Sequence, residues 1–580
     1  MAVLKNRDYK KEYDLWRTDS GFDEVTRLEL AAIAGDEREI EDRFYKDLSF
    51  GTGGLRGVMG AGTNRINEYT VRKASQGLAN YINKTGGAAK GVAIAYDSRR
   101  HSAEYAEAAA LCLNANGIKT YVFDSLRPTP ELSFAIRAKG CIAGIVITAS
   151  HNPKEYNGYK VYWEDGAQIT PPRDEEIIRE VNAVTDMKAV KAMALSDAKA
   201  SGLFNVIGED IDALYMSELK KQIIHPEIIK EMAGDLKIVY TPLNGAGNIP
   251  ARRILQELGF ENVYVVKEQE APDPEFPTLE YPNPEVAESF DLALKLAKSV
   301  GADIVIATDP DADRLGVYSY DTETGDYVRF TGNMSGILIA EYILRERKET
   351  GTLPKVPTLV KTIVTTNMAE PICNKYKTGV IEVLTGFKYI GEQIKFFEES
   401  GLNDFVFGFE ESYGCLAGTH ARDKDAIVTL MCLCEVAAWC KKNNMTLWDR
   451  MKELFDEFGY YKEDLYTQTC KGVEGAERIR RIMADLRKDT PKDIGGMKVL
   501  RVRDYSLDCI RDLRSGNTTT TGLPESDVLY FELEDDSWCC ARPSGTEPKI
   551  KFYMGVKGIS LDDAKTKLDK LTQGIKAVIE

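Results

Sequence analysis

The chain has 580 residues, of which 43% are hydrophobic and 29% charged, an ordinary composition for a water-soluble globular protein. This length is too great for one core and suggests roughly three to five domains. The 75 Lys and Arg against 91 Asp and Glu give a formal net charge of −16, which argues against a general nucleic-acid or anionic-membrane binder.

Other features of the composition indicate where the protein works. Residues 1–8 contain no apolar signal core, and the most apolar segment, 426–440, is too short to span a bilayer. The eleven cysteines and four histidines show no disulfide or metal-ligand spacing, so we expect buried reduced thiols and no zinc site. We therefore expect a cytoplasmic protein with no nucleic-acid or membrane partner, which can still bind small anions.

The first third of the chain predicts a helical arm followed by an α/β domain. Residues 10–48 are charged and amphipathic, as expected for helices that pack on the first domain. A glycine-rich loop, 50–57, carries Arg56, which could grip a phosphate through two parallel hydrogen bonds. Helices and strands then alternate as in a largely parallel sheet. The predicted helices are 71–83 and 103–116, and the predicted strands are 91–97, 120–123 and 142–147.

Small polar residues follow the strand at 142–147, in the segment 148–153 with the sequence TASHNP. Ligands bind at the carboxyl ends of strands in open α/β sheets, so Ser150 lies where a ligand is expected. The competing interpretation is a surface turn in which Ser150 and Asn152 only satisfy local backbone groups. This stretch alone does not decide between the two.

A second α/β pattern starts near residue 211 and contains the strongest chemical signal. A buried strand, 302–308, runs directly into 309–314, with the sequence DPDADR. Its three carboxylates can converge on one point, and such hard oxygen ligands suit Mg²⁺. An EF-hand does not fit, because Arg314 and Tyr320 stand where its glycine and glutamate should be. A solvated acidic turn fits poorly at the end of a buried strand, so metal binding is favoured.

A third α/β pattern begins near residue 329. Residues 385–391 follow a predicted strand at 379–383, and Glu410 and Ser412 follow a short predicted strand at 405–407. Glu410 and Ser412 could exchange hydrogen bonds with the neighbouring hydroxyls that a sugar presents.

Lys424 lies just before the apolar helix at 426–440. A lysine at this end opposes the helix dipole, which favours a role in ligand binding. Asp423 and Asp425 could instead compensate its charge.

The remainder, from about residue 461, predicts a smaller α+β module. A loop between its last strands, 541–549, carries Arg542, Ser544 and a glycine. An arginine, hydroxyls and a glycine backbone on one loop can clamp a phosphate. The competing interpretation is an ordinary Pro-Ser-Gly turn.

Taken together, four loops resemble the α-D-phosphohexomutase family, in its order along nearly the whole chain. The loops are 148–153 (TASHNP), 309–314 (DPDADR), 408–414 (GFEESYG) and 542–548 (RPSGTEP). The resemblance implies an α/β fold: three similar α/β domains with mixed, largely parallel sheets sandwiched by helices, plus a smaller α+β C-terminal domain, around a central cleft. The implied domains are 1–207 with the phosphoserine loop, 208–328 with the metal-binding loop, 329–457 with the sugar-binding loop and 458–580 with the phosphate-binding loop.

The resemblance also implies roles for individual residues. Ser150 corresponds to the serine that carries the phosphoryl group, and its phosphate would join Asp309, Asp311 and Asp313 as a ligand of Mg²⁺. The other implied catalytic residues are Arg56, His151, Lys160, Arg314 and Lys424. The implied substrate-binding residues are Thr385, Gly386, Lys388, Glu410, Ser412, Arg542, Ser544, Gly545 and Thr546. Some relatives carry a histidine shortly after the sugar-binding serine, but this chain has Tyr413-Gly414 there, so the general base stays open among Lys160, Lys424 and His151.

The activity that the resemblance implies is intramolecular phosphoryl transfer on a sugar phosphate. The Glu-Glu-Ser form of the sugar loop favours glucose, and therefore interconversion of glucose 1-phosphate and glucose 6-phosphate with Mg²⁺ and glucose 1,6-bisphosphate as cofactors. A mutase for mannose or pentose phosphates, a sugar-bisphosphate synthase, a phosphatase and a non-catalytic sugar-phosphate-binding protein remain alternatives. The resemblance is compatible with a monomer or a small homo-oligomer.

Overall fold

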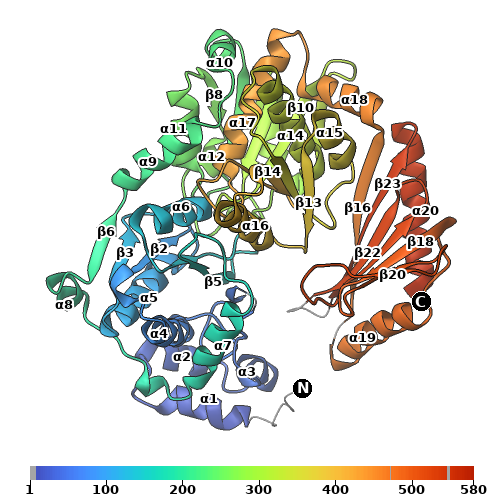
Figure 1. The fold of residues 1–580 in the computed structure, drawn as a ribbon. Coiled ribbons are helices and arrows are strands. Elements are labelled where there is room, and N and C mark those ends of the chain that lie inside the picture. The colour runs from blue at the N-terminus through green and yellow to red at the C-terminus, as the bar shows by residue number, and fades with distance from the viewer. Residues whose placement is uncertain (1–7, 52, 471, 545–548, 580) are drawn as a thin grey trace.

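The computed structural model describes residues 8–51, 53–470, 472–544 and 549–579. They form an N-terminal helical arm and four units, each built on its own sheet (Figure 1). The units follow one another along the chain and are numbered 1 to 4 below. Within the described ranges, no helix is long and apolar enough to cross a membrane.

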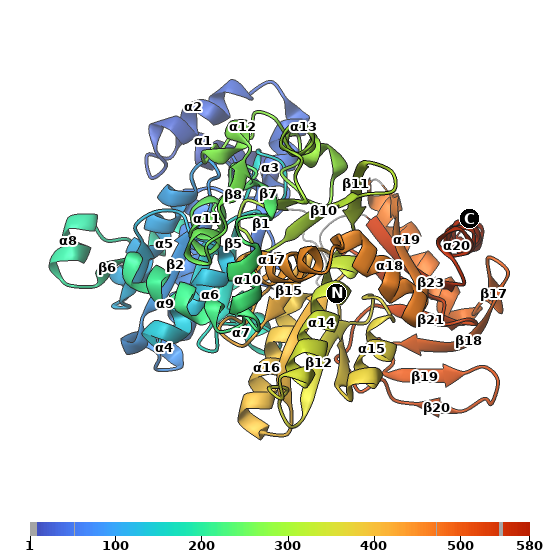
Figure 2. The same ribbon diagram turned by 90° about the horizontal axis from the view of Figure 1, so that it is seen from above.

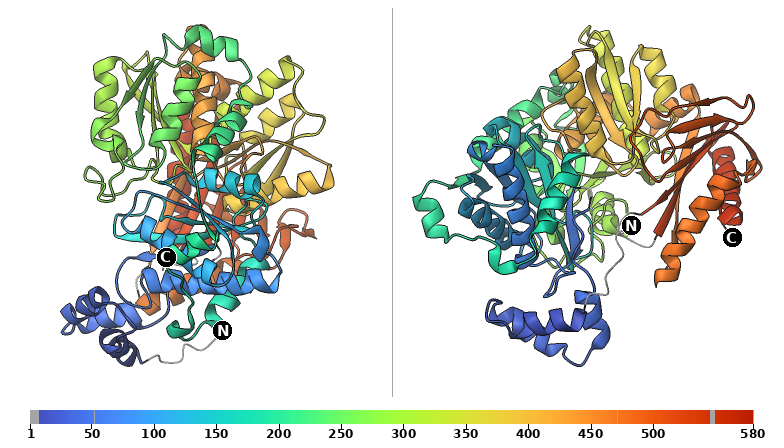
Figure 3. Two further views of the ribbon diagram at one scale, coloured as in Figure 1. Left: turned by 90° about the vertical axis from the view of Figure 1, so that its left-hand side faces the viewer. Right: turned by 60° about the horizontal axis from the view of Figure 1, so that its bottom comes forward.

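The arm consists of three short helices that form a small lobe of their own (Figure 3). They are α1 (Tyr9–Thr18), α2 (Glu24–Ala32) and α3 (Glu37–Phe44). Each helix follows an aspartate whose carboxylate accepts a hydrogen bond from a first-turn backbone N–H, which satisfies one otherwise unpaired donor. Trp16 is 1% exposed, stacks on Phe22 and meets Phe44 edge to face. These aromatic contacts give the arm its own apolar core.

Unit 1 is a six-stranded sheet in the order β1–β5–β4–β2–β3–β6. Its strands are β1 (Gly54–Val58), β2 (Val92–Tyr96), β3 (Thr120–Phe123), β4 (Ala143–Ile147), β5 (Tyr156–Trp163) and β6 (Phe204–Ile207). β4, β2, β3 and β6 are parallel, whereas β1 and β5 are antiparallel to their neighbours. Its helices are α4 (Glu68–Lys84), α5 (Ser102–Ala115), α6 (Thr129–Lys139), α7 (Arg173–Ala183) and α8 (Leu195–Ala200).

The glycine-rich stretch expected as a loop is partly strand β1. A Cβ at Gly54 would lie 1.9 Å from the carbonyl oxygen of Tyr159, so only glycine allows β1 to approach β5 this closely. Arg56 therefore projects from an edge strand and not from a loop.

Unit 2 has a five-stranded sheet in the order β11–β10–β9–β7–β8. Its strands are β7 (Lys237–Thr241), β8 (Asn262–Val265), β9 (Ile304–Thr308), β10 (Leu315–Asp321) and β11 (Asp326–Phe330). Its helices are α9 (Glu209–Lys220), α10 (Pro226–Met232), α11 (Asn248–Glu257), α12 (Lys267–Glu270) and α13 (Asp291–Val300). The proline-rich run 272–284 has no helix or strand, as its composition predicts.

Unit 3 has a four-stranded sheet in the order β13–β12–β14–β15. Its strands are β12 (Pro357–Thr362), β13 (Gly379–Val383), β14 (Asp404–Glu410) and β15 (Gly414–Ala417), and its helices are α14 (Gly332–Glu349), α15 (Ala369–Tyr376), α16 (Phe387–Ser400), α17 (Ala426–Lys442) and α18 (Leu447–Phe458). α17 is apolar around its whole circumference because it packs against α10 and α11 of unit 2 as well as α14 and β15 of unit 3. One continuous apolar core runs through units 1 to 3.

Unit 4 is an antiparallel sheet in the order β16–β23–β22–β21–β18–β19–β20, with β17 paired to β18. Its strands are β16 (Tyr460–Thr469), β17 (Asp493–Ile494), β18 (Met497–Asp504), β19 (Cys509–Asp512), β20 (Thr518–Thr519), β21 (Leu529–Leu533), β22 (Trp538–Pro543) and β23 (Lys549–Gly558), and its helices are α19 (Gly472–Lys488) and α20 (Leu561–Ile579). The helices pack on one face of the sheet. Figure 2 shows unit 4 beside unit 3, where Tyr505, Tyr530 and Trp538 of the other face pack with Ile363 and Leu384.

The expected fold class is confirmed: three α/β units with mixed, largely parallel sheets are followed by a β-rich C-terminal unit. Ten of the eleven cysteines are buried, and all eleven are free thiols, as their irregular spacing predicts.

Candidate active site

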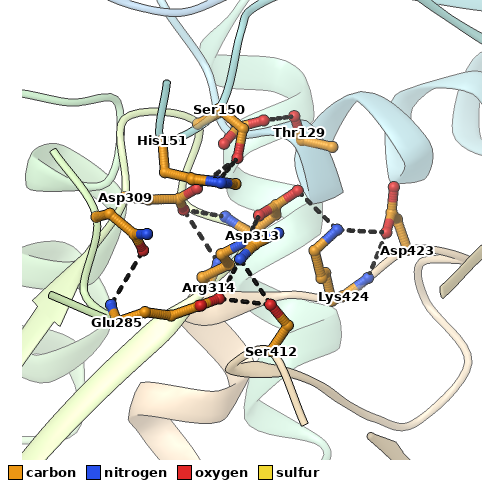
Figure 4. Close-up of polar contacts among 12 residues, drawn as sticks. Thr129, Ser150, His151, Glu285, Asp309, Asp313, Arg314, Ser412, Asp423 and Lys424 are labelled. Carbon is orange, nitrogen blue, oxygen red and sulfur yellow. Dashed lines mark hydrogen bonds and ion pairs between the residues drawn. The ribbon is translucent and has the colours of Figure 1, made fainter. Parts of the chain in front are cut away.

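Ser150 lies three residues beyond the end of β4, in a left-handed backbone conformation with φ of 53°. This conformation costs a non-glycine residue about 1–2 kcal/mol, so the loop must be held by its surroundings. The side chain is 3% exposed, and its hydroxyl donates a 2.8 Å hydrogen bond to Oδ2 of Asp309 in unit 2 (Figure 4). Nδ1 of His151 lies 3.1 Å from the same Ser150 oxygen.

Asp309, Asp311 and Asp313 follow β9 and form the acidic cluster facing Ser150. Their ligand atoms lie within 4.8 Å of one another, and each residue is at most 1% exposed. Among the described residues, Oδ1 of Asp311 and Oδ1 of Asp313 receive no hydrogen bond. Buried carboxylate oxygens without donors are costly, and a hard divalent cation such as Mg²⁺ would satisfy them. The residues present therefore fit a metal ion.

The charges of this acidic cluster are interdependent. Burial, together with Asp311 and Asp313, raises the pKa of Asp309 well above its ordinary value. Burial opposes ionisation of Asp311 as well, but Lys160, a hydrogen bond with Asp309 and Lys424 together outweigh it and hold the pKa of that carboxyl below its ordinary value. The neighbouring carboxylates thus oppose the ionisation of Asp309, and a bound cation would relieve this repulsion.

Two lysines from different units neutralise the acidic cluster. Nζ of Lys160, on β5, lies 2.9 Å from Oδ2 of Asp311 and 3.7 Å from Oδ2 of Asp313. Nζ of Lys424, just before α17, lies 2.8 Å from Oδ2 of Asp313. Burial alone would lower the pKa of Lys424. Asp313, Asp423 and Glu410 raise it by more than burial lowers it, so the ammonium stays charged. Lys424 thus forms ion pairs with Asp313 and Asp423, and its expected role in ligand binding stays a prediction.

The two predicted arginines are placed differently. Arg314 is largely buried, donates a 2.9 Å hydrogen bond to the hydroxyl of Ser412 and forms an ion pair with Glu285 (Figure 4). Arg56 is exposed and donates a 3.3 Å hydrogen bond to Oδ1 of Asn152 in the Ser150 loop. Burial, together with Arg314 and Arg56, lowers the pKa of His151 well below its ordinary value, so its imidazole is neutral.

The predicted sugar-binding residues lie at the end of β14, which extends further than the short strand expected and includes Glu410. Burial raises the pKa of Glu410 to about 7. Ser412 donates a 2.5 Å hydrogen bond to Glu285 of unit 2. Ser412, Arg314 and Glu285 therefore meet at the junction of units 2 and 3.

Thr385, Gly386 and Lys388 lie at the start of α16. Gly386 has φ of 122°, a conformation that favours glycine. The Thr385 hydroxyl is buried without a hydrogen-bond partner among the described residues, which leaves it available to a ligand. Lys388 lies 3.8 Å from Asp174, and burial, with a contribution from Arg542, lowers its pKa.

The C-terminal phosphate loop is described in part. Arg542 lies near the end of β22 and Ser544 follows that strand, whereas Gly545 and Thr546 lie outside the described residues. The charge of Arg542 contributes to lowering the pKa of Lys388, near the start of α16, so the two cations lie in the same region of the molecule. The structure thus brings Arg542 to the loops of unit 3, and it groups Ser150 with the acidic cluster of unit 2.

Three residues that sequence reasoning did not identify belong to the site. The hydroxyl of Thr129, at the start of α6, donates a 2.9 Å hydrogen bond to Asp311, and the rule that ligands bind at strand ends could have indicated it, since it follows β3. Glu285 follows the irregular run 272–284, and the sequence pattern of such a run does not predict where a side chain lies in the fold. Lys551 lies directly opposite Arg542 in the register of β22 and β23, and strand alternation alone could have placed both on one face.

The chain matches known proteins over most of its length. Residues 47–188, 213–322 and 331–458 match the models of alpha/beta/alpha domains I, II and III of the phosphoglucomutase/phosphomannomutase family. A phosphoglucomutase of Staphylococcus aureus (strain bovine RF122 / ET3-1) is 35% identical over 533 residues, which cover 92% of this chain and 94% of that protein.

Two solved structures share the fold. The open form of Paramecium pp63/parafusin, a phosphoglucomutase, superposes with a TM-score of 0.68 at 20% identity and covers 92% of this chain and 94% of its own. A putative phosphomannomutase from Thermus thermophilus gives a TM-score of 0.67 at 21% identity, with 92% and 99% covered.

Proposed function

Because the chain belongs to the phosphoglucomutase/phosphomannomutase family, we propose that it interconverts glucose 1-phosphate and glucose 6-phosphate through a phosphoserine at Ser150. The observation that carries the proposal is the 2.8 Å hydrogen bond from the Ser150 hydroxyl to Asp309, within a cluster of three carboxylates. A serine hydroxyl is a weak nucleophile without a partner base, but as a phosphate carrier beside a cation site it needs no permanent activation.

The reaction consists of two phosphoryl transfers. In the first, the bond between phosphorus and Ser150 Oγ breaks as a bond forms to the 6-hydroxyl oxygen of glucose 1-phosphate, and the hydroxyl proton passes to a nitrogen base. This gives glucose 1,6-bisphosphate, which turns over within the site. In the second, the 1-phosphoryl group moves to Ser150, the new 1-hydroxyl gains a proton and glucose 6-phosphate leaves. The candidate bases are His151 and Lys160, because the ammonium of Lys424, the third candidate from the sequence, stays charged.

Asp309, Asp311 and Asp313 would hold the metal ion, which supplies electrostatic stabilisation of phosphoryl oxygens when bound. Arg56 and Arg314 contribute fixed positive charge beside the Ser150 loop, and Lys424 does so beside Asp313. Phosphoryl transfer is catalysed largely by such positioning and charge, so the arrangement supports this chemistry.

We assign the sugar and the distant phosphate to units 3 and 4. Glu410 and Ser412 would bind hydroxyls of glucose, with Thr385 and Lys388 beside them. Arg542, Ser544 and Lys551 would bind the phosphate that is not reacting, with Gly545 and Thr546 of the same loop. Among the described residues, neither Arg542 nor Lys551 is ion-paired with a carboxylate, and burial together with Arg542 lowers the pKa of Lys551. Two adjacent cations that lack a direct ion pair favour an anionic ligand.

The test is a turnover assay with glucose 1-phosphate, a trace of glucose 1,6-bisphosphate and Mg²⁺, repeated with mannose 1-phosphate and ribose 1-phosphate. We expect glucose 6-phosphate without net release of inorganic phosphate, and greater kcat/KM for glucose than for the other sugars. Ser150→Ala should abolish turnover, since no other described residue faces Asp309 with a hydroxyl donor. Net phosphate release would instead identify a phosphatase, and preference for another sugar would reassign the substrate.

A further inference from the structure

Arg99 is a fully buried arginine directly beneath the Ser150 loop. It follows β2, and its side chain is 0% exposed. Its Nη1 donates hydrogen bonds to the carbonyl oxygens of Pro153, at 2.7 Å, and Tyr156, at 3.0 Å. Its Nη2 donates to the carbonyl oxygen of Ser150, at 2.6 Å, and to that of Asn152. One guanidinium thus binds four backbone carbonyls, that of Ser150 and three from the residues that follow it.

Asp97 completes this anchor. Its Oδ2 lies 3.3 Å from Nε of Arg99 and accepts a 2.6 Å hydrogen bond from the hydroxyl of Thr148. That hydroxyl in turn accepts a 2.7 Å hydrogen bond from the backbone N–H of Ser150. The backbone N–H and C=O of Ser150 are therefore both tied, through side chains, to the segment that follows β2.

The geometry matches what only arginine can supply. A guanidinium presents five N–H donors in a rigid plane, whereas a lysine ammonium has three donors and no fixed plane. Burying a charged group is costly unless it is fully hydrogen-bonded. Most of the N–H donors of Arg99 form hydrogen bonds with the Ser150 loop. A non-glycine residue in the left-handed conformation, such as Ser150, is stable only where the surrounding contacts hold its backbone in place.

The same anchor reaches unit 2, which carries the acidic cluster. The guanidinium carbon of Arg99 lies 5.3 Å from the ring centre of Phe276, in the proline-rich run. The neighbouring Glu275 pairs with Arg100 and lies 3.4 Å from Nζ of Lys154 in the Ser150 loop. A movement of the Ser150 loop relative to unit 2 would therefore change the position of Ser150 relative to Asp309.

We propose that Arg99 is a positioning residue that fixes the Ser150 loop against unit 2, so that Ser150 Oγ faces Asp309 in the geometry required for phosphoryl transfer. The catalytic part of this inference rests on the proposed function. Arg99 touches the backbone of the nucleophile loop and acts on the reaction through Ser150.

The test compares Arg99→Ala and Arg99→Lys with Arg65→Ala and Arg65→Lys. Arg65 is a matched control because it is 6% exposed and donates to the carbonyl oxygens of Asp42 and Asn64, beside the N-terminal arm. We expect Arg99→Ala to lower kcat about 100-fold, the effect of a displacement of about 1 Å at a reacting group. KM for glucose 1-phosphate should change less than about threefold, because the phosphate-binding residues of unit 4 remain in place. Arg99→Lys should lose nearly as much, and millimolar guanidinium should restore part of kcat to Arg99→Ala only.

A second measurement does not depend on the proposed function. Amide hydrogen exchange of peptides covering 148–157 should be faster in both Arg99 variants than in the wild type and in both Arg65 variants. Unchanged exchange there, or equal kcat losses in the Arg99 and Arg65 variants, would overturn the proposal. If the wild type itself showed no isomerisation, the proposed function would fail, and the exchange result would still decide whether Arg99 anchors the loop.

Discussion

Glu410 offers a sharp test of how the site binds its substrate. Burial raises the pKa of this carboxyl to about 7, although Lys424 and Arg314 act in the opposite direction. Ionised Glu410 can accept hydrogen bonds from two sugar hydroxyls, whereas its protonated form has less acceptor capacity. The competent carboxylate is therefore lost as the pH falls through about 7.

The size of the effect follows from this pKa. The ionised fraction is about 0.09 at pH 6 and about 0.91 at pH 8, so kcat/KM should rise roughly tenfold through Glu410 over this interval. Hydrogen bonds to a charged group contribute about 1.5–3 kcal/mol. Glu410→Gln should accordingly lower kcat/KM at pH 8 by about 10-fold to about 150-fold.

The assay is the initial rate of glucose 6-phosphate formation at subsaturating glucose 1-phosphate from pH 5.5 to 8.5. The phosphate of the substrate also titrates near pH 6, but it does so equally for both proteins, so the ratio of wild-type to Glu410→Gln rates isolates the glutamate. We expect this ratio to rise roughly tenfold between pH 6 and pH 8. A ratio that stays constant with pH would show that ionisation of Glu410 does not control substrate binding.

Three further predictions concern the metal, the distant phosphate and the core. Asp311→Asn should lower the affinity for Mg²⁺ more than about 10-fold, because it removes a ligating charge, and titration calorimetry of the two proteins measures this directly. Lys551→Gln should raise KM for glucose 1-phosphate roughly 10-fold with little change in kcat, whereas Lys557→Gln on the same strand should not. Burial raises the pKa of Glu435, on α17, to about 7. Because this folded-state pKa exceeds the unfolded value, the wild type loses stability through this group as the pH rises from about 4.5 to about 7. Relative to the wild type, Glu435→Gln should gain roughly 3 kcal/mol between pH 5 and pH 8 in denaturant unfolding, and a pH-independent difference would contradict this.

The elements that the sequence predicted well are those whose burial is visible in the residue pattern. The strands ending at Ile147 and Thr308 are continuous apolar runs, as expected for parallel strands covered on both faces. The polar residues directly after each strand therefore lie at the carboxyl end of its own sheet. The strand pattern does not show that the two loops meet across two sheets; the pairing of Ser150 with the acidic loop is expected only from the family resemblance.

The elements that could not be predicted depend on tertiary contacts. β1 looks like a glycine-rich loop, because its strand conformation comes from pairing with β5. Glu285 reaches Arg314 and Ser412 from an irregular segment, whose path is fixed by packing and not by any periodicity. The helix α17 reads as an ordinary apolar helix, and nothing in its own sequence indicates that it packs against unit 2 as well as unit 3.

Arg99 lies between these cases. Its position after β2 follows from the strand pattern, and the strand-end rule places it near a ligand site. Its function as an anchor for Ser150 depends on four backbone carbonyls contributed by a loop more than 50 residues away. Backbone acceptors leave no signature in side-chain identity, so only the structure could reveal this contact.

The central claim is that Ser150 carries the phosphoryl group, and peptide mass spectrometry tests it most directly. The protein is incubated with Mg²⁺ and glucose 1,6-bisphosphate, quenched and digested, and the digest is compared with that of Ser150→Ala. The account predicts a phosphoryl group on Ser150 that disappears when glucose 1-phosphate or glucose 6-phosphate is added, as glucose 1,6-bisphosphate forms. A protein that isomerises glucose phosphates with Ser150 never phosphorylated, or with the phosphoryl group on another residue, would contradict it.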